Sequence, residues 1–300
     1  MPWRDQGVVV FGDSARDLAR HFIQRWNQTK KEQCPDLETI NYLLPKSNTQ
    51  KVNYTFRQWF KEDVFRCNLQ ILRSADDWSV GITKTEKSIL NAYIDLIQSS
   101  KYYIYIENQF FITTTDPLKD DDVKNTIGLE LVNRIVKAHK NNELFKVYVV
   151  LPLLPGFEKM NTIKAVQYYN LKSIKFGEYS IYNRLKKEGI LDPTEYITFH
   201  GMRNWSVLMG KLVQEIIYVH SKLMIVDDKY VICGSANIND RSLLGKRDSE
   251  IACIIKDEDF FDSKLNNKQV KVGKYAHSLR TKIFKYYLYI YIYRVYFILR

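Results

Sequence analysis

Cysteine is scarce in this sequence, and its few cysteines lack the pattern of a metal or disulfide site. Only four cysteines occur in 300 residues, with no CxxC pair and no other metal-ligand spacing. Cys233 and Cys253 lie in apolar, strand-like segments, where a free thiol packs as a small hydrophobic side chain. These features argue against a disulfide framework and predict a reducing, cytoplasmic compartment.

Long uninterrupted apolar runs are absent as well. The first residues, MPWRDQGVVV, lack the charged and then apolar pattern of a signal peptide. The most apolar stretch, KIFKYYLYIYIYRVYFILR at 282–300, is interrupted by Lys285 and Arg294, whereas a membrane span needs about 20 predominantly apolar residues. We therefore expect residues 281–300 to form an atypical, aromatic-rich and β-prone tail that touches a membrane surface or another chain.

Positive charge, in contrast, is in excess. The chain has 45 lysines and arginines against 34 aspartates and glutamates, which gives a formal net charge of +11. Such a surplus favours anionic partners, namely nucleic acid, phospholipid headgroups or a phosphate-bearing substrate. The charge alone does not choose among them.

Strands and helices are expected to alternate along most of the chain. Ser14 is placed to cap a first helix, and the polar, irregular residues 36–62 are predicted to be a linker. This alternation predicts an α/β sandwich with a mixed β-sheet flanked by helices. No repeat of 20 to 50 residues is present. Further helices are expected at 85–100, 128–140 and 162–189, and strands at 65–74, 101–112, 145–157, 215–238 and 249–257.

The stretch YVHSKLMIVDDKYVICGSANIND, residues 218–240, has the pattern of a buried β-hairpin with unusual polar content. Alternation along a strand puts His220 and Lys222 on one face. If the turn at 227–229 leaves two or four residues unpaired, Ser235 and Asn237 lie on that same face, whereas a three-residue turn puts them on the opposite face. The pattern leaves this register open.

These side chains suit the chemistry of a phosphate ester. Histidine titrates near neutral pH and can act as nucleophile, acid or base, while lysine is a compact cation for phosphate oxygens. Ser235 and Asn237 can donate hydrogen bonds to the same oxygens. Asp227 fits the turn, where it fixes backbone geometry. A catalytic histidine needs an orienting carboxylate, and we expect Glu250, at the start of the next strand, to supply it for His220.

The combination His220-x-Lys222-xxxx-Asp227 with Gly234-Ser235-x-Asn237 resembles the HKD signature of the phospholipase D superfamily. The flanking stretches RDLARHFIQRWN (16–27), YIYIENQFF (103–111), VYVVLPLLPGF (147–157) and GSANINDRSLLGKRDSE (234–250) resemble the animal phosphatidylcholine-hydrolysing phospholipases D. The similarity covers most of residues 1–280.

This resemblance implies a site that needs no catalytic metal or other cofactor. His220 would be the general acid and base, and Lys222, Ser235 and Asn237 would contact the phosphate. Members of the family carry two HKD motifs, of which the first supplies the histidine nucleophile, whereas this sequence contains one HxK, matching the second motif. Residues 1–35 are accordingly expected to be the tail of a first repeat, and residues 63–280 the second catalytic repeat.

Two further groups of candidate residues follow. Glu107, Asn108 and Gln109 end a strand near the hairpin and either line the substrate pocket or form a buried polar cluster. Arg16, Arg20 and Arg25, joined by Lys30 and Lys31, make a basic helix face. By resemblance that face would bind phosphatidylinositol bisphosphate as an activator at a membrane surface, although such a face is also common on a solvated helix.

Three functions remain open from the sequence. The chain is a phosphatidylcholine-type phospholipase D that needs a missing N-terminal HKD half, or a single-HKD phosphodiesterase completed by a second copy. Alternatively, it is an inactive fragment that binds anionic membrane. In each case we expect a cytoplasmic protein, peripheral on membranes, with no nucleic-acid partner.

Overall fold

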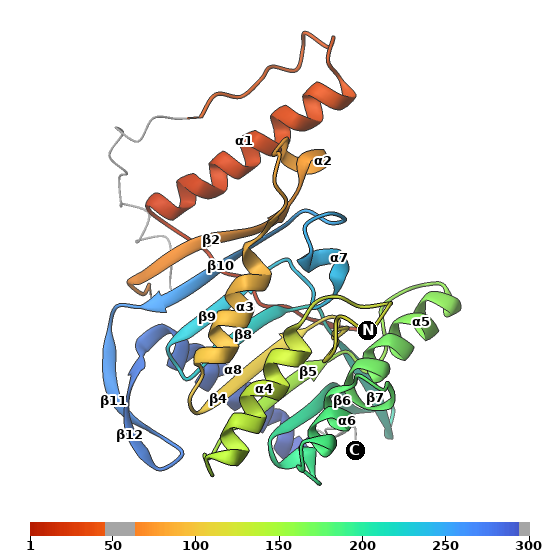
Figure 1. Ribbon diagram of the computed structural model, residues 1–300, viewed down its shortest axis with the longest axis vertical. Helices are drawn as coiled ribbons and strands as arrows, with labels where there is room; N and C mark the ends of the chain where they lie inside the picture. Colours follow the sequence, from red (N-terminus) through yellow and green to blue (C-terminus); the bar gives the residue numbers. More distant parts are fainter. Residues whose placement is uncertain (46–63, 294–300) are drawn as a thin grey trace.

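The computed structural model describes residues 1–45 and 64–293 (Figure 1). Most of the expected linker, and residues 294–300 of the expected tail, lie outside the described residues. The described chain forms one mixed sheet in the strand order β1-β7-β6-β5-β4-β8-β9-β10-β2-β3, with a separate hairpin β11-β12. Its strands are β1 (Trp3–Arg4), β2 (Cys67–Ala75), β3 (Glu86–Lys87), β4 (Tyr103–Asn108), β5 (Lys146–Leu151), β6 (Ile197–Leu208), β7 (Lys211–Val219), β8 (Lys222–Val226), β9 (Tyr230–Gly234), β10 (Glu250–Asp257), β11 (Phe260–Leu265) and β12 (Lys268–Gly273).

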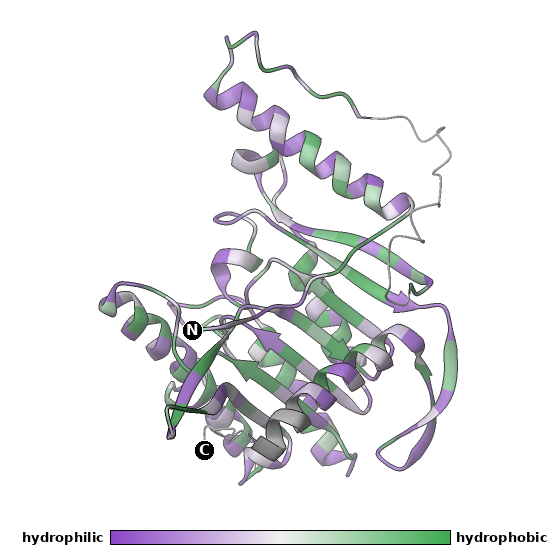
Figure 2. Ribbon diagram, turned by 180° about the vertical axis from the view of Figure 1, so that it is seen from behind, coloured by the Kyte–Doolittle hydropathy of each residue, from purple (hydrophilic) through white to green (hydrophobic). Residues whose placement is uncertain are grey.

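Helices cover both faces of this sheet, as the alternating pattern predicted. Figure 1 shows α3, α4 and α6 over one face, and Figure 2, from behind, shows α8 against the other. The helices are α1 (Asp13–Gln33), α2 (Asp77–Val80), α3 (Ser88–Ser99), α4 (Ile127–Lys140), α5 (Met160–Leu171), α6 (Ile181–Lys187), α7 (Asp240–Leu243) and α8 (Lys274–Tyr293), with a π-turn at Lys172–Phe176 and a 3₁₀ turn at Pro193–Glu195.

The central strand β4 explains why the core has two halves. Ile104 and Ile106 belong to the core under α3 and α4, whereas Tyr103 and Tyr105 belong to the core under α8. A strand that is buried on both faces has apolar side chains at every position, as the sequence YIYI does. β4 runs parallel to β5 and antiparallel to β8, so the carboxyl end of β4 lies beside the start of β8.

Two local predictions are wrong. Ser14 does not cap the first helix, because α1 begins at Asp13 and the Ser14 hydroxyl donates to the Leu69 carbonyl at 3.1 Å. The expected β-prone tail is helical through Tyr293. The Asp257 carboxylate accepts the backbone N–H groups of Tyr275 and Ala276 at 2.7 and 3.0 Å, which satisfies donors that the first turn of α8 leaves open. Tertiary packing therefore outweighs the β propensity of the tail.

Among the described residues, no helix is both long and apolar enough to span a membrane.

Candidate active site

The N-terminal segment holds the backbone on both sides of His220. β1 runs parallel to β7, and the Tyr218 N–H donates to the Pro2 carbonyl at 2.8 Å. The His220 N–H donates to the Arg4 carbonyl at 2.7 Å. The Trp3 ring lies 4.6 Å from the His220 ring, centre to centre. Residues 2–5 thus form one wall around the histidine.

Asp5 is the carboxylate that orients His220. Its Oδ2 lies 2.8 Å from His220 Nδ1, and because an ionised carboxylate only accepts hydrogen bonds, Nδ1 carries the proton. The other ring nitrogen, Nε2, is then available to a ligand on the partly exposed side of the ring. A histidine oriented in this way can exchange a proton with a bound substrate.

The expected pairing of Glu250 with His220 is therefore wrong. The two carboxylate oxygens of Glu250 accept from the hydroxyls of Ser235 and Ser242, at 2.5 and 2.6 Å. Burial raises the pKa of Glu250 above its usual range, and the two hydroxyls and the charge of Lys222 oppose that rise. Glu250 sits beside Lys222 rather than on the histidine ring.

Lys222 is only 6% exposed and points into the same end of the sheet. Its ammonium donates to Gln109 Oε1 at 3.0 Å and to the His220 carbonyl. Burial lowers the pKa of Lys222 to about 8, against the attraction of Asp5 and Glu250. A lysine this desolvated attracts an anion that enters the site more strongly than a surface lysine does.

The three polar residues at the end of β4 have different surroundings. Gln109 joins the site, because it bonds Lys222 through Oε1 and donates from Nε2 to the Tyr218 hydroxyl at 2.6 Å. Glu107 is fully buried, where it accepts from Arg4 at 3.2 Å and from the Tyr105 hydroxyl at 2.7 Å.

Asn108 belongs to the loop framework. Its Oδ1 accepts the backbone N–H groups of Phe110 and Ile238 at 3.2 and 3.1 Å. The contact with Ile238 is buried and that with Phe110 partly buried, so Asn108 fixes the path of the chain between β4 and the segment after β9. The expected closeness of this strand end to the hairpin is confirmed by the pairing of Asn108 with Lys222.

The hairpin itself has the three-residue turn. Val226 pairs with Tyr230, and continuing this register would turn Ser235 and Asn237 away from the face of Lys222. The ladder ends at the pair of Leu223 with Cys233, however, so both residues lie beyond the paired strands. Ser235 lies past the end of β9, where its hydroxyl reaches Glu250. In the described part of the chain, no hydrogen bond joins Ser235 or Asn237 to His220 or Lys222. The buried Asn237 Oδ1 lacks a hydrogen-bond partner among the described residues.

Asp227 lies at the opposite end of β8 from the histidine. Its carboxylate accepts the backbone N–H groups of Lys101, Tyr102 and Tyr103 at 2.7, 2.7 and 2.9 Å. Its own backbone has a positive φ of 53°, as the tight turn requires. Asp227 therefore anchors the start of β4 and does not touch the side chains around His220, in agreement with the turn role expected for it.

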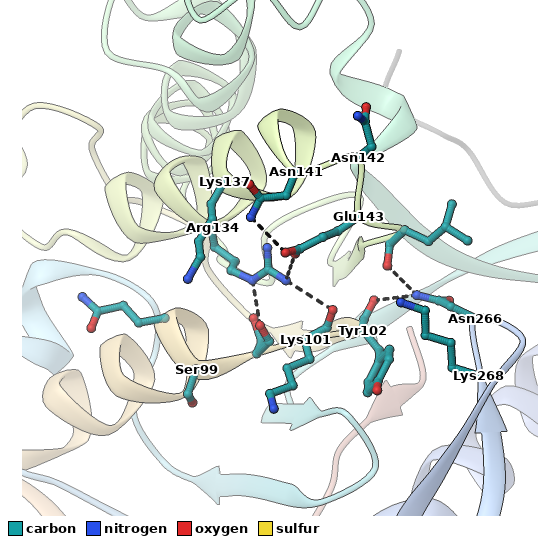
Figure 3. A pocket seen from close by; sticks show the side chains of 13 residues that line it. Ser99, Lys101, Tyr102, Arg134, Lys137, Asn141, Asn142, Glu143, Asn266 and Lys268 are labelled. Atoms are coloured by element: carbon teal, nitrogen blue, oxygen red, sulfur yellow. Dashed lines mark hydrogen bonds and ion pairs between the residues drawn. The ribbon is translucent and has the colours of Figure 1, made fainter.

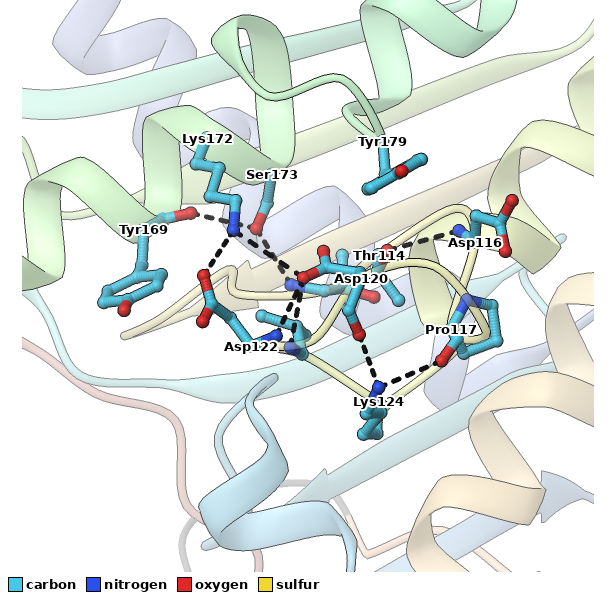
Figure 4. Close-up of polar contacts among 12 residues, drawn as sticks. Thr114, Asp116, Pro117, Asp120, Asp122, Lys124, Tyr169, Lys172, Ser173 and Tyr179 are labelled. Carbon is cyan, nitrogen blue, oxygen red and sulfur yellow. Dashed lines mark hydrogen bonds and ion pairs between the residues drawn. The ribbon is translucent and has the colours of Figure 1, made fainter.

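Two acidic residues of the loop after β4, Asp120 and Asp122, make contacts that hold the loop in place. Asp120 accepts the N–H groups of Asp122 and Val123, and Lys172 bonds Asp122 at 2.6 Å (Figure 4). Lys124 donates from its ammonium to the Asp120 carbonyl at 2.5 Å. These contacts fix the loop between β4 and α4. No group of three or more potential metal-binding side chains occurs among the described residues.

Comparison with known proteins identifies the family. The family model described as Phospholipase D matches residues 1–214 and 206–279. The chain belongs to the phospholipase D family. It is 47% identical over 293 residues to human phospholipase D1 and 41% identical over 298 residues to phospholipase D1 of Saccharomyces cerevisiae. These alignments cover 95% and 96% of this chain but 27% and 18% of the relatives, so the chain spans about a quarter or less of their length.

Two solved structures give a partial likeness. The family member Nuc from Salmonella typhimurium is 18% identical, with a TM-score of 0.35 over 72% of this chain and 91% of that chain. The phosphatidylserine synthase of Haemophilus influenzae is 14% identical, with a TM-score of 0.42 over 78% of this chain and 40% of that chain.

The arginines expected to bind phosphoinositide do not share one environment in this phospholipase D chain. Arg25 donates to the Ser79 carbonyl at 2.6 Å and lies 5.5 Å from the centre of the Trp78 ring, so it ties α1 to α2. Arg20 pairs with Asp17 at 2.7 Å, and Arg16 lies 3.9 Å from Asp13.

Lys30 is not part of an exposed basic face. It is buried and donates to the carbonyls of Cys34 and Leu37 at 3.3 and 3.1 Å. The exposed basic part of this helix is therefore smaller than the sequence pattern indicated.

A separate cavity of about 660 Å³ lies at the start of β4, away from His220 (Figure 3). Arg134 spans its wall and donates to the carbonyls of Ser100 and Lys101 and to Glu143. None of the candidate site residues lines this cavity.

Proposed function

We propose that residues 63–280 form the second catalytic repeat of a phosphatidylcholine-hydrolysing phospholipase D, and that residues 1–35 end its first repeat. The observation that carries the proposal is the 2.8 Å contact between Asp5 and His220, two residues that are 215 positions apart. The pair is partly exposed, with His220 31% and Asp5 52% accessible, and it supplies the carboxylate that an acid–base role of His220 requires.

The chemistry follows from this pair. A histidine supplied by the other half of the site attacks phosphorus and forms a phosphohistidine, while the bond from phosphorus to the choline oxygen breaks. In this step His220 starts as the imidazolium, donates its Nε2 proton to the departing alkoxide and becomes neutral, while Asp5 holds the Nδ1 proton and stabilises the charged ring. His220 then takes a proton from water, whose oxygen attacks the phosphohistidine and releases phosphatidic acid. A primary alcohol in place of water gives the transphosphatidylation product.

The cation and the hydrogen-bond donors serve the phosphate. Lys222, held by Gln109, stabilises the non-bridging oxygens as charge develops on them. Ser235 and Asn237 lie past the end of β9, where the strand register no longer sets their direction, and we propose them as further contacts to the phosphate. Glu250 holds the Ser235 hydroxyl. The reaction needs no metal or other cofactor.

A single histidine cannot be the phosphorylated nucleophile and the proton donor in the same step. Because the sequence contains one HxK, the complete site requires either the missing N-terminal HKD half or a second copy of the chain. With neither present, the chain remains an inactive membrane-binding fragment.

The proposed substrate lies in a membrane, so we infer a cytoplasmic protein that is peripheral on phospholipid surfaces. Arg16 and Arg20 on α1, with phosphatidylinositol bisphosphate as the activating lipid, supply one attachment. Charge reversal of both arginines should weaken sedimentation with vesicles that contain this lipid, whereas the equal change in charge by Lys264→Glu with Lys268→Glu, at exposed positions of β11 and β12, should not. Equal weakening by both changes would point to net charge alone.

The experiment that tests the catalytic proposal is transphosphatidylation by the purified chain on phosphatidylcholine vesicles with a primary alcohol. His220→Ala should abolish the product, and His139→Ala, at an exposed histidine that bonds the Tyr196 hydroxyl, should not. Product from the chain alone, with a second-order dependence on protein concentration, would indicate a homodimer. Product only after the N-terminal half is added would indicate a site assembled from two pieces. No product in either condition would contradict the proposal.

A further inference from the structure

β6 and β7 continue as a two-stranded hairpin beyond the edge of the sheet. The last pair between β5 and β6 is Leu151 with Gly201, and β1 joins β7 only from Tyr218 onward. Between these limits, the rungs from Met202–Ile217 to Leu208–Lys211 are bonded only within the hairpin. At about 3.4 Å per residue, the tip extends roughly 20 Å past the sheet. Met209 and Gly210 both have positive φ, as a two-residue turn of this kind requires.

The outer part of this hairpin, residues 203–214, is apolar and exposed on both faces. Val207 pairs with Leu212 on one face, while Leu208 and Val213 occupy the other. Met209 at the turn is 95% exposed and Leu208 is 63% exposed. Neither hydrophobic core includes any residue of this outer part. Folding therefore does not account for these apolar side chains.

The charges of the hairpin tip have one sign. Residues 203–214 contain Arg203 and Lys211 and no carboxylate. The next acidic residue along the hairpin, Glu215, lies outside this segment. An apolar tip with a lysine beside the turn matches the boundary between anionic headgroups and acyl chains.

The hairpin also lies at the edge of the sheet that carries the candidate active site. β6 runs parallel to β5 and β4, so it leaves the sheet at their carboxyl ends, where Gln109 contacts Lys222. β7 leads from the hairpin tip directly to His220. Leu154, Phe157 and Met160, in the segment after β5, are exposed at the same edge.

We propose that the β6–β7 hairpin inserts its tip into the interface of a phospholipid bilayer and thereby holds the active-site edge of the sheet against the membrane. The inference rests on the proposed function for its choice of phospholipid as the partner class. A protein partner would cover one face of the hairpin, whereas a bilayer surrounds both. The unpaired outer edges of the two strands limit the depth of insertion to the turn and the nearest rungs, because backbone groups without hydrogen bonds are strongly disfavoured in hydrocarbon.

Binding of the full chain to vesicles tests the proposal without any turnover. Val207→Ser, Leu208→Ser and Met209→Ser combined should weaken sedimentation with phosphatidylcholine vesicles containing phosphatidic acid by about tenfold or more. The matched control is Leu191→Ser, because Leu191 is 86% exposed but lies before the 3₁₀ turn that precedes β6. All substituted side chains are exposed, so the thermal unfolding temperature should stay unchanged.

Insertion has a second readout in tryptophan fluorescence. Met209→Trp should gain a blue-shifted emission on vesicles and be quenched by brominated phosphatidylcholine, relative to the unsubstituted chain, whereas Leu191→Trp should show neither effect. Vesicle binding that the hairpin substitutions leave unchanged would overturn the proposal, as would an absence of binding by the unsubstituted chain. A blue shift that grows with protein concentration in the absence of vesicles would assign the hairpin to self-association and also overturn it. Since no product is measured, a failed phospholipase assay leaves these results interpretable.

Discussion

Replacing Asp227 by asparagine separates a structural role for this motif residue from a chemical one. Asp227 Oδ1 accepts from the N–H groups of Tyr102 and Tyr103, and Oδ2 accepts from that of Lys101. An asparagine can keep the first two bonds through its carbonyl oxygen. Its amide NH₂ then faces the Lys101 N–H, and two donors cannot bond each other. Asp227→Asn therefore leaves one backbone donor without a partner at the start of β4.

The magnitude follows from two opposing effects. An unsatisfied buried donor destabilises by about 1–3 kcal/mol, and the lost charge-assisted bonds add to this. Burial raises the pKa of Asp227 against its three backbone bonds, so the neutral amide recovers part of the desolvation penalty. We expect a net loss of about 1–3 kcal/mol of unfolding free energy. With an unfolding entropy of about 2.1 cal/mol/K per residue, this lowers Tm by roughly 2–5 °C.

Urea unfolding and calorimetry measure this change, with Asp262→Asn as the control. Asp262 is an exposed carboxylate on β11 that pairs with Lys271 at 3.3 Å, and its loss should shift stability by about 0.5 kcal/mol or less. Well below the Tm, binding of inorganic phosphate should be the same in Asp227→Asn as in the unsubstituted chain. An unchanged Tm with lost phosphate binding would refute the structural role and assign Asp227 to the chemistry of the site.

Three other changes test the site and its support. Asp5→Asn should lower turnover of the assembled site by about 10²–10⁴-fold with little change in KM, since the His220 ring loses its orienting acceptor; a change in KM alone would contradict this role. Burial lowers the pKa of Lys222 to about 8, so the ammonium is charged below that pH, and phosphate binding should fall as the pH rises through 8. Lys222→Arg should move this fall to higher pH. A binding profile that does not move would exclude Lys222 as the group that titrates. Burial tends to raise the pKa of Asp228, but the bonds from Arg280 hold that pKa below its usual range. The ion pair therefore stabilises the fold above about pH 4, and this contribution is lost as the pH falls further. Asp228→Asn should accordingly flatten the acid side of a curve of unfolding free energy against pH.

The sheet was predictable because its strands carry period-two and continuous apolar patterns. The alternating isoleucines and tyrosines of β4 face two cores. The pairing of Asn108 with Lys222 puts the start of β8 beside the end of β4, as expected of the strand that ends in Glu107, Asn108 and Gln109. The C-terminal helix α8 was not predictable from local pattern. Its aromatic and β-branched residues favour strands, and the groups that stabilise the helix, Asp257 and Asp228, lie on other elements.

The orienting carboxylate was missed for a related reason. Asp5 lies 215 residues before His220, and nothing in its neighbourhood marks it as a partner of the histidine. Glu250 was closer along the chain and began the adjacent strand, but β10 pairs with β9 so that Glu250 reaches Ser235 instead. The parallel pairing of β1 with β7 is the signal that brings Asp5 to the site, and such a two-residue strand is too short to recognise in sequence.

The contacts of residues 2–5 with β7 and His220 make this N-terminal segment part of the acid–base site. The backbone of residues 2–5 pairs beside Tyr218 and His220, and the side chains of Trp3 and Asp5 contact the histidine ring. A chain that kept the HKD hairpin but lost these residues would retain His220 and Lys222 without the carboxylate that fixes the ring. The span from Pro2 to the end of β10 therefore carries this half of the site, and the motif alone does not.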